Sequence, residues 1–178
     1  ERILSSFENG EIDILIGTQM LTKGLDFSRV SLVGVLNADT MLNYPDFRAY
    51  ERAFQLLCQV SGRSGRKQKQ GLVLIQTNSP DHSVLQQVVT NDYFAMYNQQ
   101  MKERKEFSYP PFVRLINVIL KHRDEEILKK ASSELAYYLR QSFGERVLGP
   151  NEPTVARVQN MYLKRITLKI EQNASVQE

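Results

Sequence analysis

The chain has 178 residues, 42% hydrophobic and 24% charged, enough apolar mass for one large or two small folded domains. No run approaches the roughly 18 apolar residues of a membrane span, and the first residues lack a secretory signal pattern. The single cysteine, Cys58, excludes an internal disulfide or a cysteine-cluster zinc site in this chain. We expect Cys58 to be a buried small hydrophobe and the compartment to be a reducing cytoplasm.

The net charge of +3 is too small to indicate nucleic-acid binding, but its distribution is uneven. Residues 61–70 carry four basic side chains and no acidic one, whereas residues 1–60 are acidic on balance and residues 71–178 are nearly neutral. The positive charge is therefore concentrated in one short stretch, where it can attract an anion.

The first 80 residues predict strands that alternate with a helix. Short apolar runs at 12–16, 30–36 and 71–76 predict buried strands. Residues 45–60 predict a helix, because apolar side chains recur every three or four positions and Pro45 suits a first helical turn. This alternation predicts an α/β layer with a parallel sheet.

Residues 81–111 predict a helical linker between two domains. Asp81 can cap one helix, and a second is expected over 92–106. The Tyr-Pro-Pro-Phe sequence at 109–112 must end the second helix, because proline lacks the amide donor and pushes the preceding residue out of the helical region.

A strand at 115–120 and a helix over 124–143 follow. The helix has acidic residues in its first turn and Gly144 just past its end, as helix termini favour. The side chains expected on its buried face are Leu128, Ala131, Leu135 and Tyr138.

The last predicted strand, 162–170, alternates between apolar and polar side chains. Ile166, Leu168 and Ile170 fall on one face, so the other face is expected to be wet. Residues 112–171 thus predict a small α+β domain, and residues 172–178 a polar tail.

Two glycine-rich clusters carry candidate chemistry, and the first spans Gln59 to Gln68. Arg63 and Arg66 stand three apart, and each is preceded by glycine. A guanidinium matches a phosphate with a planar fork of donors, and glycine permits close backbone approach. Such a loop can stabilise charge during phosphoryl transfer, although a basic surface turn has the same composition.

The second cluster, residues 17–27, follows the first predicted strand, where ligands of open α/β sheets bind. The Thr18 hydroxyl can donate to a phosphodiester, and Gln19 can reach a phosphate or a sugar. Gly24 permits close approach, and Asp26 can accept from a ribose hydroxyl. A loop with an Asx turn has the same composition, so that alternative stays open.

In this order and on this frame, the two clusters resemble motifs V and VI of superfamily 2 helicases, in the second of two RecA-like lobes. The resemblance implies that Thr18 contacts the nucleic-acid backbone and that Arg66 is an arginine finger assisted by Arg63. The other residues implied to bind the nucleotide are Gly24, Asp26 and Gln59; those implied to bind DNA also include Gln19 and Lys23.

Four segments are more specifically similar to the PriA (primosomal protein N′) family: 14–24, 46–52, 59–66 and 109–112. The resemblance extends, more weakly, to residues 148–150 and 165–169. It implies a 3′→5′ DNA helicase that acts at stalled replication forks and D-loops during replication restart. The implied partners are forked or single-stranded DNA, other primosome proteins and single-strand-binding protein.

The same resemblance implies that ATP with Mg²⁺ is bound mainly by an upstream lobe, and that zinc belongs to an upstream module. This chain contains neither Gly-x-x-x-x-Gly-Lys-Ser/Thr nor a DExH box. We therefore expect a partial second lobe, a C-terminal fragment that neither hydrolyses ATP nor unwinds DNA by itself.

Other interpretations remain open at the level of sequence. Residues 107–170 can be a docking domain for fork DNA or a protein, without motor activity, or the chain can belong to another superfamily 2 helicase or translocase. Arg48, Glu51 and Arg52 can position motif VI or simply form an exposed helix face. A basic sheet face with an interleaved aromatic ring is also possible, built from Arg157, Tyr162, Lys164, Arg165 and Lys169.

Overall fold

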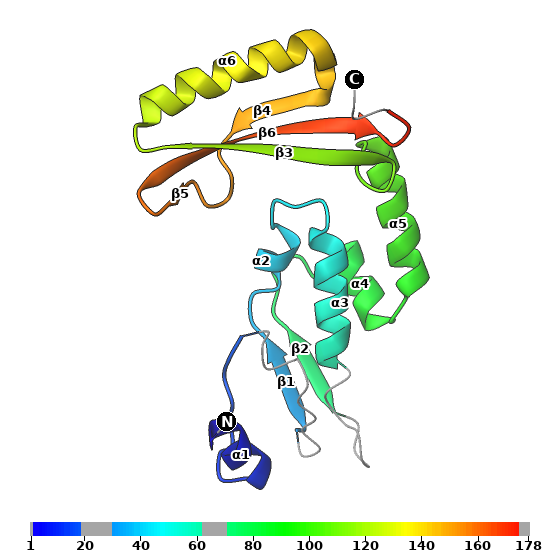
Figure 1. Ribbon diagram of the computed structural model, residues 1–178. Helices are drawn as coiled ribbons and strands as arrows, with labels where there is room; N and C mark the ends of the chain where they lie inside the picture. Colours follow the sequence, from blue (N-terminus) through cyan, green and yellow to red (C-terminus); the bar gives the residue numbers. More distant parts are fainter. Residues whose placement is uncertain (1, 19–29, 62–70, 175–178) are drawn as a thin grey trace. The chain divides into compact units, whose positions relative to one another are not determined.

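The fold is that of a computed structural model, which describes residues 2–18, 30–61 and 71–174 (Figure 1). The chain forms two compact units that divide between Gln100 and Met101. Among the described residues, no helix has the length and apolarity that a membrane span requires.

The first unit contains a parallel pair of strands, β1 (Leu32–Val35) and β2 (Leu72–Ile75) (Figure 1). Leu32 stands opposite Leu72, and the register continues to the ends of both strands. The mixed α/β class and the parallel sheet predicted from the sequence are thereby confirmed.

The strand predicted at 12–16 is not formed, so that prediction is wrong. Ile14 and Ile16 are 76% and 85% exposed. A strand exists only through hydrogen bonds to a neighbour, and a buried one needs neighbours on both sides. Within the described residues, β1 and β2 pair only with each other, and neither pairs with this segment.

Helices build the core of the first unit. α1 (Arg2–Asn9) buries no side chain, whereas α2 (Asp39–Leu42), α3 (Ala49–Ser61) and α4 (Ser83–Val89) each do. Val35 and Ile75 of the strands pack against the cluster that these helices form. The buried members of this cluster are Ala38, Leu42, Ala53, Phe54, Leu57, Val84, Leu85, Val88 and Met96.

Two helices start later than the sequence predicted. α3 begins at Ala49 rather than near Pro45, because the Asp46 carboxylate accepts the backbone N–H of Arg48 and shapes a turn first. α4 is capped by His82 rather than by Asp81, because the imidazole Nδ1 accepts from the backbone N–H of Val84 at 3.3 Å.

The helix predicted at 92–106 is present as α5 (Tyr93–Glu106). Asp92 caps it by accepting the backbone N–H of Ala95 at 2.9 Å. Met96 and Gln100 are buried in the part of α5 that belongs to the first unit, and the remainder belongs to the second.

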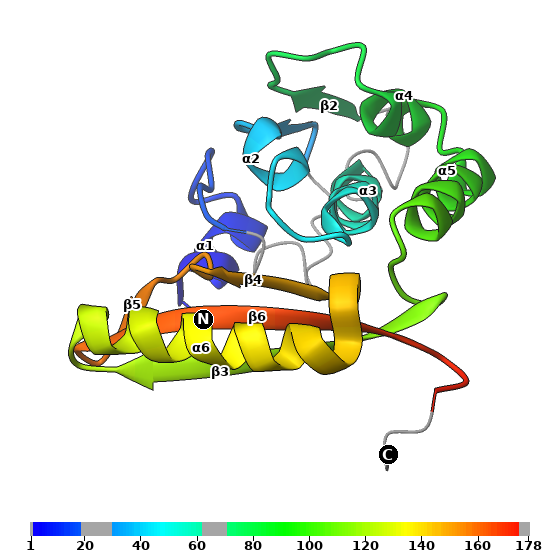
Figure 2. The ribbon, with the colours of Figure 1, turned by 90° about the horizontal axis from the view of Figure 1, so that it is seen from above.

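The second unit is a helix packed on an antiparallel sheet. The strands run in the order β3 (Val113–His122), β6 (Met161–Glu171), β4 (Val147–Asn151), and the short β5 (Arg157–Val158) pairs with β6. α6 (Glu125–Phe143) lies along one face of this sheet, as Figures 1 and 2 both show. A 3₁₀ turn, η2 (Gly144–Arg146), leads from α6 into β4.

The ends of α6 agree with the sequence, and its buried face agrees in part, because Leu128 and Leu135 face the sheet as predicted. Asp124 caps the helix by accepting from the backbone N–H groups of Glu126 and Ile127, and Gly144 ends it with a positive φ of 58°. Ala131 and Tyr138 are exposed. The side chains that face the sheet are Leu128, Ser132, Leu135, Ala136, Leu139 and Phe143.

The alternation predicted for the last strand is confirmed. Ile166, Leu168 and Ile170 are each at most 6% exposed and form the core under α6 together with Val147. On the opposite face of the sheet, Ile119 of β3 is 57% exposed.

Candidate functional site

The residues of the two glycine-rich clusters lie only partly in the described chain. Thr18 is exposed at the end of the extended segment that follows α1. Gln19, Lys23, Gly24 and Asp26 lie outside the described residues, and so do Arg63 and Arg66.

Gln59 is the candidate binding residue of the first cluster, Gln59 to Gln68, that lies in the described chain. It is half-buried on the last turn of α3, between Leu57 and Val60 of the core. The Ser61 hydroxyl donates to the Leu57 carbonyl at 2.8 Å and closes the helix. The core therefore fixes the point from which the chain enters residues 62–70.

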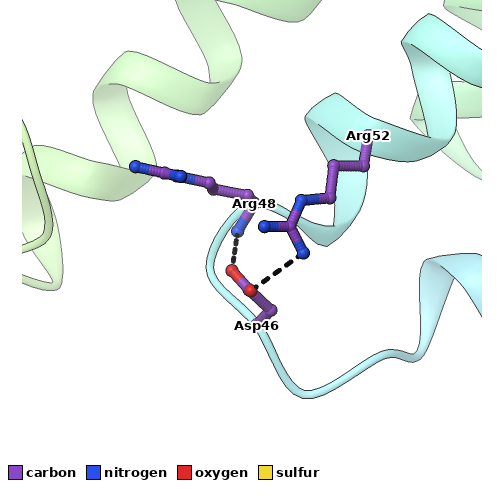
Figure 3. Close-up of polar contacts among 3 residues, drawn as sticks. All are labelled: Asp46, Arg48 and Arg52. Atoms are coloured by element: carbon purple, nitrogen blue, oxygen red, sulfur yellow. Dashed lines mark hydrogen bonds and ion pairs between the residues drawn. The ribbon is translucent and has the colours of Figure 1, made fainter. Parts of the chain in front are cut away.

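The other end of α3 is organised around Asp46 (Figure 3). One carboxylate oxygen accepts the backbone N–H of Arg48 at 2.8 Å, and the other is 3.1 Å from the guanidinium of Arg52. This ion pair is mostly exposed, so by itself it contributes at most about 1 kcal/mol. It holds the start of α3 and takes up the charge of Asp46.

Arg48 differs from Arg52 in having no carboxylate partner. Its guanidinium lies over the Phe47 ring, 5.1 Å from the centroid, and Figure 3 shows it pointing away from Asp46. Across residues 2–18, 30–61 and 71–174, no ion pair involves this side chain. Among the described residues, the positive charge of Arg48 is therefore not paired with a carboxylate.

A carboxylate that sequence reasoning missed joins the two loops at the carboxyl ends of β1 and β2. Asp39 accepts from the Thr77 hydroxyl at 2.6 Å and from the backbone and side-chain N–H groups of Asn78 at 2.9 and 2.8 Å. The hydrogen bond from Thr77 is the largest cause that holds the pKa of Asp39 below its ordinary value.

No local pattern could have identified this contact. Asp39 and Asn78 are 39 residues apart, and each belongs to an ordinary turn sequence. The available signal was topological, because parallel strands bring their carboxyl ends to one edge.

Cys58 packs against the core of the first unit, but it is half-buried rather than buried as expected. Burial raises the pKa of its thiol.

The basic side chains expected on one sheet face of the second unit lie on both faces, because the strand register places them on opposite sides of β6. Lys164 shares the side of Ile166, whereas Arg165 and Lys169 project from the opposite side of β6. Tyr162 also falls on the side of Lys164. These residues therefore do not form one continuous basic surface, because side chains alternate along a strand.

Most of these cations already have partners. Lys164 pairs with Glu152 at 2.9 Å, and the Arg157 guanidinium lies 4.8 Å from the centroid of the Tyr162 ring. The Lys169 ammonium donates to the Phe107 carbonyl at 2.6 Å and sits 4.2 Å from the Tyr109 ring centroid. Burial lowers the pKa of Lys169.

The Tyr-Pro-Pro-Phe segment is tied to the end of β6 by these contacts. Besides the bond from Lys169, the Gln172 amide donates to the Pro111 carbonyl, and Arg104 donates to the Pro110 carbonyl at 3.4 Å. Arg165 projects from the same side of β6 as Lys169, and its Nε is buried without an acceptor within the described part of the chain.

Residues 1–68 match the family described as helicase conserved C-terminal domain, so the first unit is of the helicase C-terminal class. Residues 105–178 match the family described as primosomal protein N C-terminal domain. The chain, which carries the two matches in this order, belongs to the PriA family.

Similar curated proteins agree with this assignment. The chain is 45% identical to replication restart protein PriA of Bacillus subtilis (strain 168), over 99% of this chain and 22% of that protein. It is 40% identical to the protein of the same name from Synechocystis sp., over 94% of this chain and 20% of that protein. The chain thus spans about a fifth of the length of these relatives.

Proposed function

We propose that the chain is the C-terminal part of an ATP-dependent DNA helicase that moves 3′→5′ and acts at stalled replication forks and D-loops in replication restart. The observation that supports this most directly is the succession of a helicase C-terminal match and a primosomal C-terminal match along one chain. The proposed setting is the bacterial cytoplasm, and the proposed partners are DNA, other primosome proteins and single-strand-binding protein.

In this proposal the first unit supplies half of an ATP site. α3 holds Gln59 beside the core and leads directly to Arg63 and Arg66. Amide and guanidinium donors suit phosphate oxygens, and they do not suit Mg²⁺, which prefers oxygen ligands. Arg66 would stabilise the charge that develops on the transferred phosphoryl group, with Arg63 assisting. Gly24 and Asp26 would contact the nucleotide, while the rest of the protein would hold Mg²⁺ and most of the ATP.

The proposed DNA contacts of the first unit are Thr18, Gln19 and Lys23. In the second unit, the proposed DNA contacts are Arg165 and Lys169, which project from the same side of β6. The Lys169 ammonium is already engaged by the Phe107 carbonyl and the Tyr109 ring, so a contact with DNA would add to these contacts or replace them.

The arginine finger is tested by replacing Arg66 with alanine in the full-length protein. We expect kcat for DNA-stimulated ATP hydrolysis to fall by about 10³ or more, because the developing phosphoryl charge loses its guanidinium. Steady-state ATP hydrolysis measures this, and Lys69→Ala is the matched control, since it removes one charge from the same segment. Near-normal turnover in Arg66→Ala, or an equal loss in both variants, would reject the finger.

A further inference from the structure

Arg48 stands out among the described cations because its surroundings orient it without neutralising it. The side chain is exposed, and the Phe47 ring lies 5.1 Å beneath the guanidinium. A guanidinium that stacks by its face keeps its N–H edge available for an acceptor. The nearby carboxylate of Asp46 is occupied by Arg52 and by the backbone N–H of Arg48 itself.

The position of Arg48 in the first unit separates it from the nucleotide side. Arg48 directly precedes α3, and Figure 1 shows the start of α3 beside α2, the helix that follows the carboxyl end of β1. Figure 1 shows α3 running back from there alongside the strands. Gln59 is ten residues beyond Ala49 on this helix, hence about 15 Å away along its axis. One arginine side chain therefore cannot contact ligands at both ends of α3.

The charge of Arg48 and its location together indicate that it binds an anion other than ATP. The carboxyl edge of a parallel sheet is where ligands of α/β proteins bind. Among the described carboxylates near the start of α3, Asp39 and Asp46 are taken up by hydrogen bonds or by the ion pair, and Glu51 in the first turn accepts from the Gln55 amide at 3.5 Å. A ligand with repeated phosphates can reach this edge while ATP occupies the other end of α3, and a nucleic acid is such a ligand.

We propose that Arg48 binds a backbone phosphate of DNA at the carboxyl edge of the β1–β2 pair, with Asp46 and Arg52 as positioning residues. This inference rests on the proposed function, because it assumes that the full-length protein binds DNA. Arg48 adds to the DNA contacts proposed above, and it contacts no nucleotide.

The test uses the full-length protein and single-stranded oligo(dT), with affinity measured over a range of salt concentrations. We expect Arg48→Ala to weaken binding about tenfold and to reduce the slope of log affinity against log salt by about 0.7, as the loss of one single-strand phosphate contact requires. Arg48→Lys should keep the slope and lose part of the affinity, because an ammonium makes no bidentate contact. The KM for ATP in the absence of DNA should not change.

The matched control is Arg123→Ala, which removes an exposed arginine that has no assigned role. Unchanged affinity and slope in Arg48→Ala would overturn the inference while leaving the proposed function intact. An equal loss in both variants, or a raised KM for ATP without DNA, would also overturn it. If the unsubstituted protein fails to bind oligo(dT), the proposed function fails together with the inference.

Discussion

Single side chains decide how the carboxyl edge of the first unit is built. The Asp39 carboxylate joins two loops, and the Asp46 carboxylate sets the start of α3. The sequence could point to Arg48 and Arg52, because they stand in a recognisable helix. The sequence could not show that Arg52 rather than Arg48 forms the ion pair with Asp46, because the pairing depends on the orientation of the Asp46 carboxylate.

Asp39 makes the stability of the first unit depend on pH. Its pKa is lowered in the folded state, so its hydrogen bonds stabilise the fold above the unfolded-state pKa, and this contribution disappears as pH falls through the lower folded value. We expect Asp39→Asn to lower the melting temperature at pH 7, because an amide nitrogen would meet the donors of Asn78.

The melting temperatures of Asp39→Asn and the unsubstituted protein should converge as pH falls below about 3.8, the ordinary value for an aspartate. Calorimetric scans between neutral and acidic pH measure this. Asp81→Asn is the control, because it removes the same charge from an exposed side chain near α4. A difference that persists unchanged at low pH would contradict the assignment.

At the scale of elements, local patterns predicted what local forces determine. α6 begins and ends where its acidic first turn and Gly144 indicated, because capping acts between neighbouring residues. Its buried face was predicted less well, since Ser132 packs inward while Tyr138 stays exposed. The segment at 12–16 failed as a strand because strand formation depends on distant partners.

Two glycines make a matched test of element geometry. Gly149 in β4 has a φ of 95°, and a Cβ there would lie 2.7 Å from the Arg165 carbonyl oxygen. We expect Gly149→Ala to destabilise the second unit by about 1–3 kcal/mol, from backbone strain and this clash. Gly34 in β1 has no such atom within 4 Å, so Gly34→Ala should stay within about 0.5 kcal/mol. Denaturant unfolding of both variants checks this, and equal effects would contradict it.

At the scale of the whole molecule, each compact unit has a core of its own. Hydrophobic periodicity predicted an α/β part followed by an α+β part, because each core imposes its own pattern. The units divide within the linker predicted at 81–111, but the exact point was not visible in the sequence, since α5 continues through it without a break. The DNA and nucleotide contacts at Thr18, Arg63 and Arg66 stay predictions, which DNA-binding and ATP-hydrolysis measurements can test.

The central claim is that this chain carries one half of an ATP site, and ATP hydrolysis tests it most directly. The rate is measured for the isolated 178-residue chain and for the full-length protein at equal concentrations, with and without single-stranded DNA. We expect DNA-stimulated hydrolysis by the full-length protein and none above background by the isolated chain, because most of the nucleotide contacts are proposed to lie elsewhere in the protein. Robust hydrolysis by the isolated chain, or none by the full-length protein, would contradict the claim.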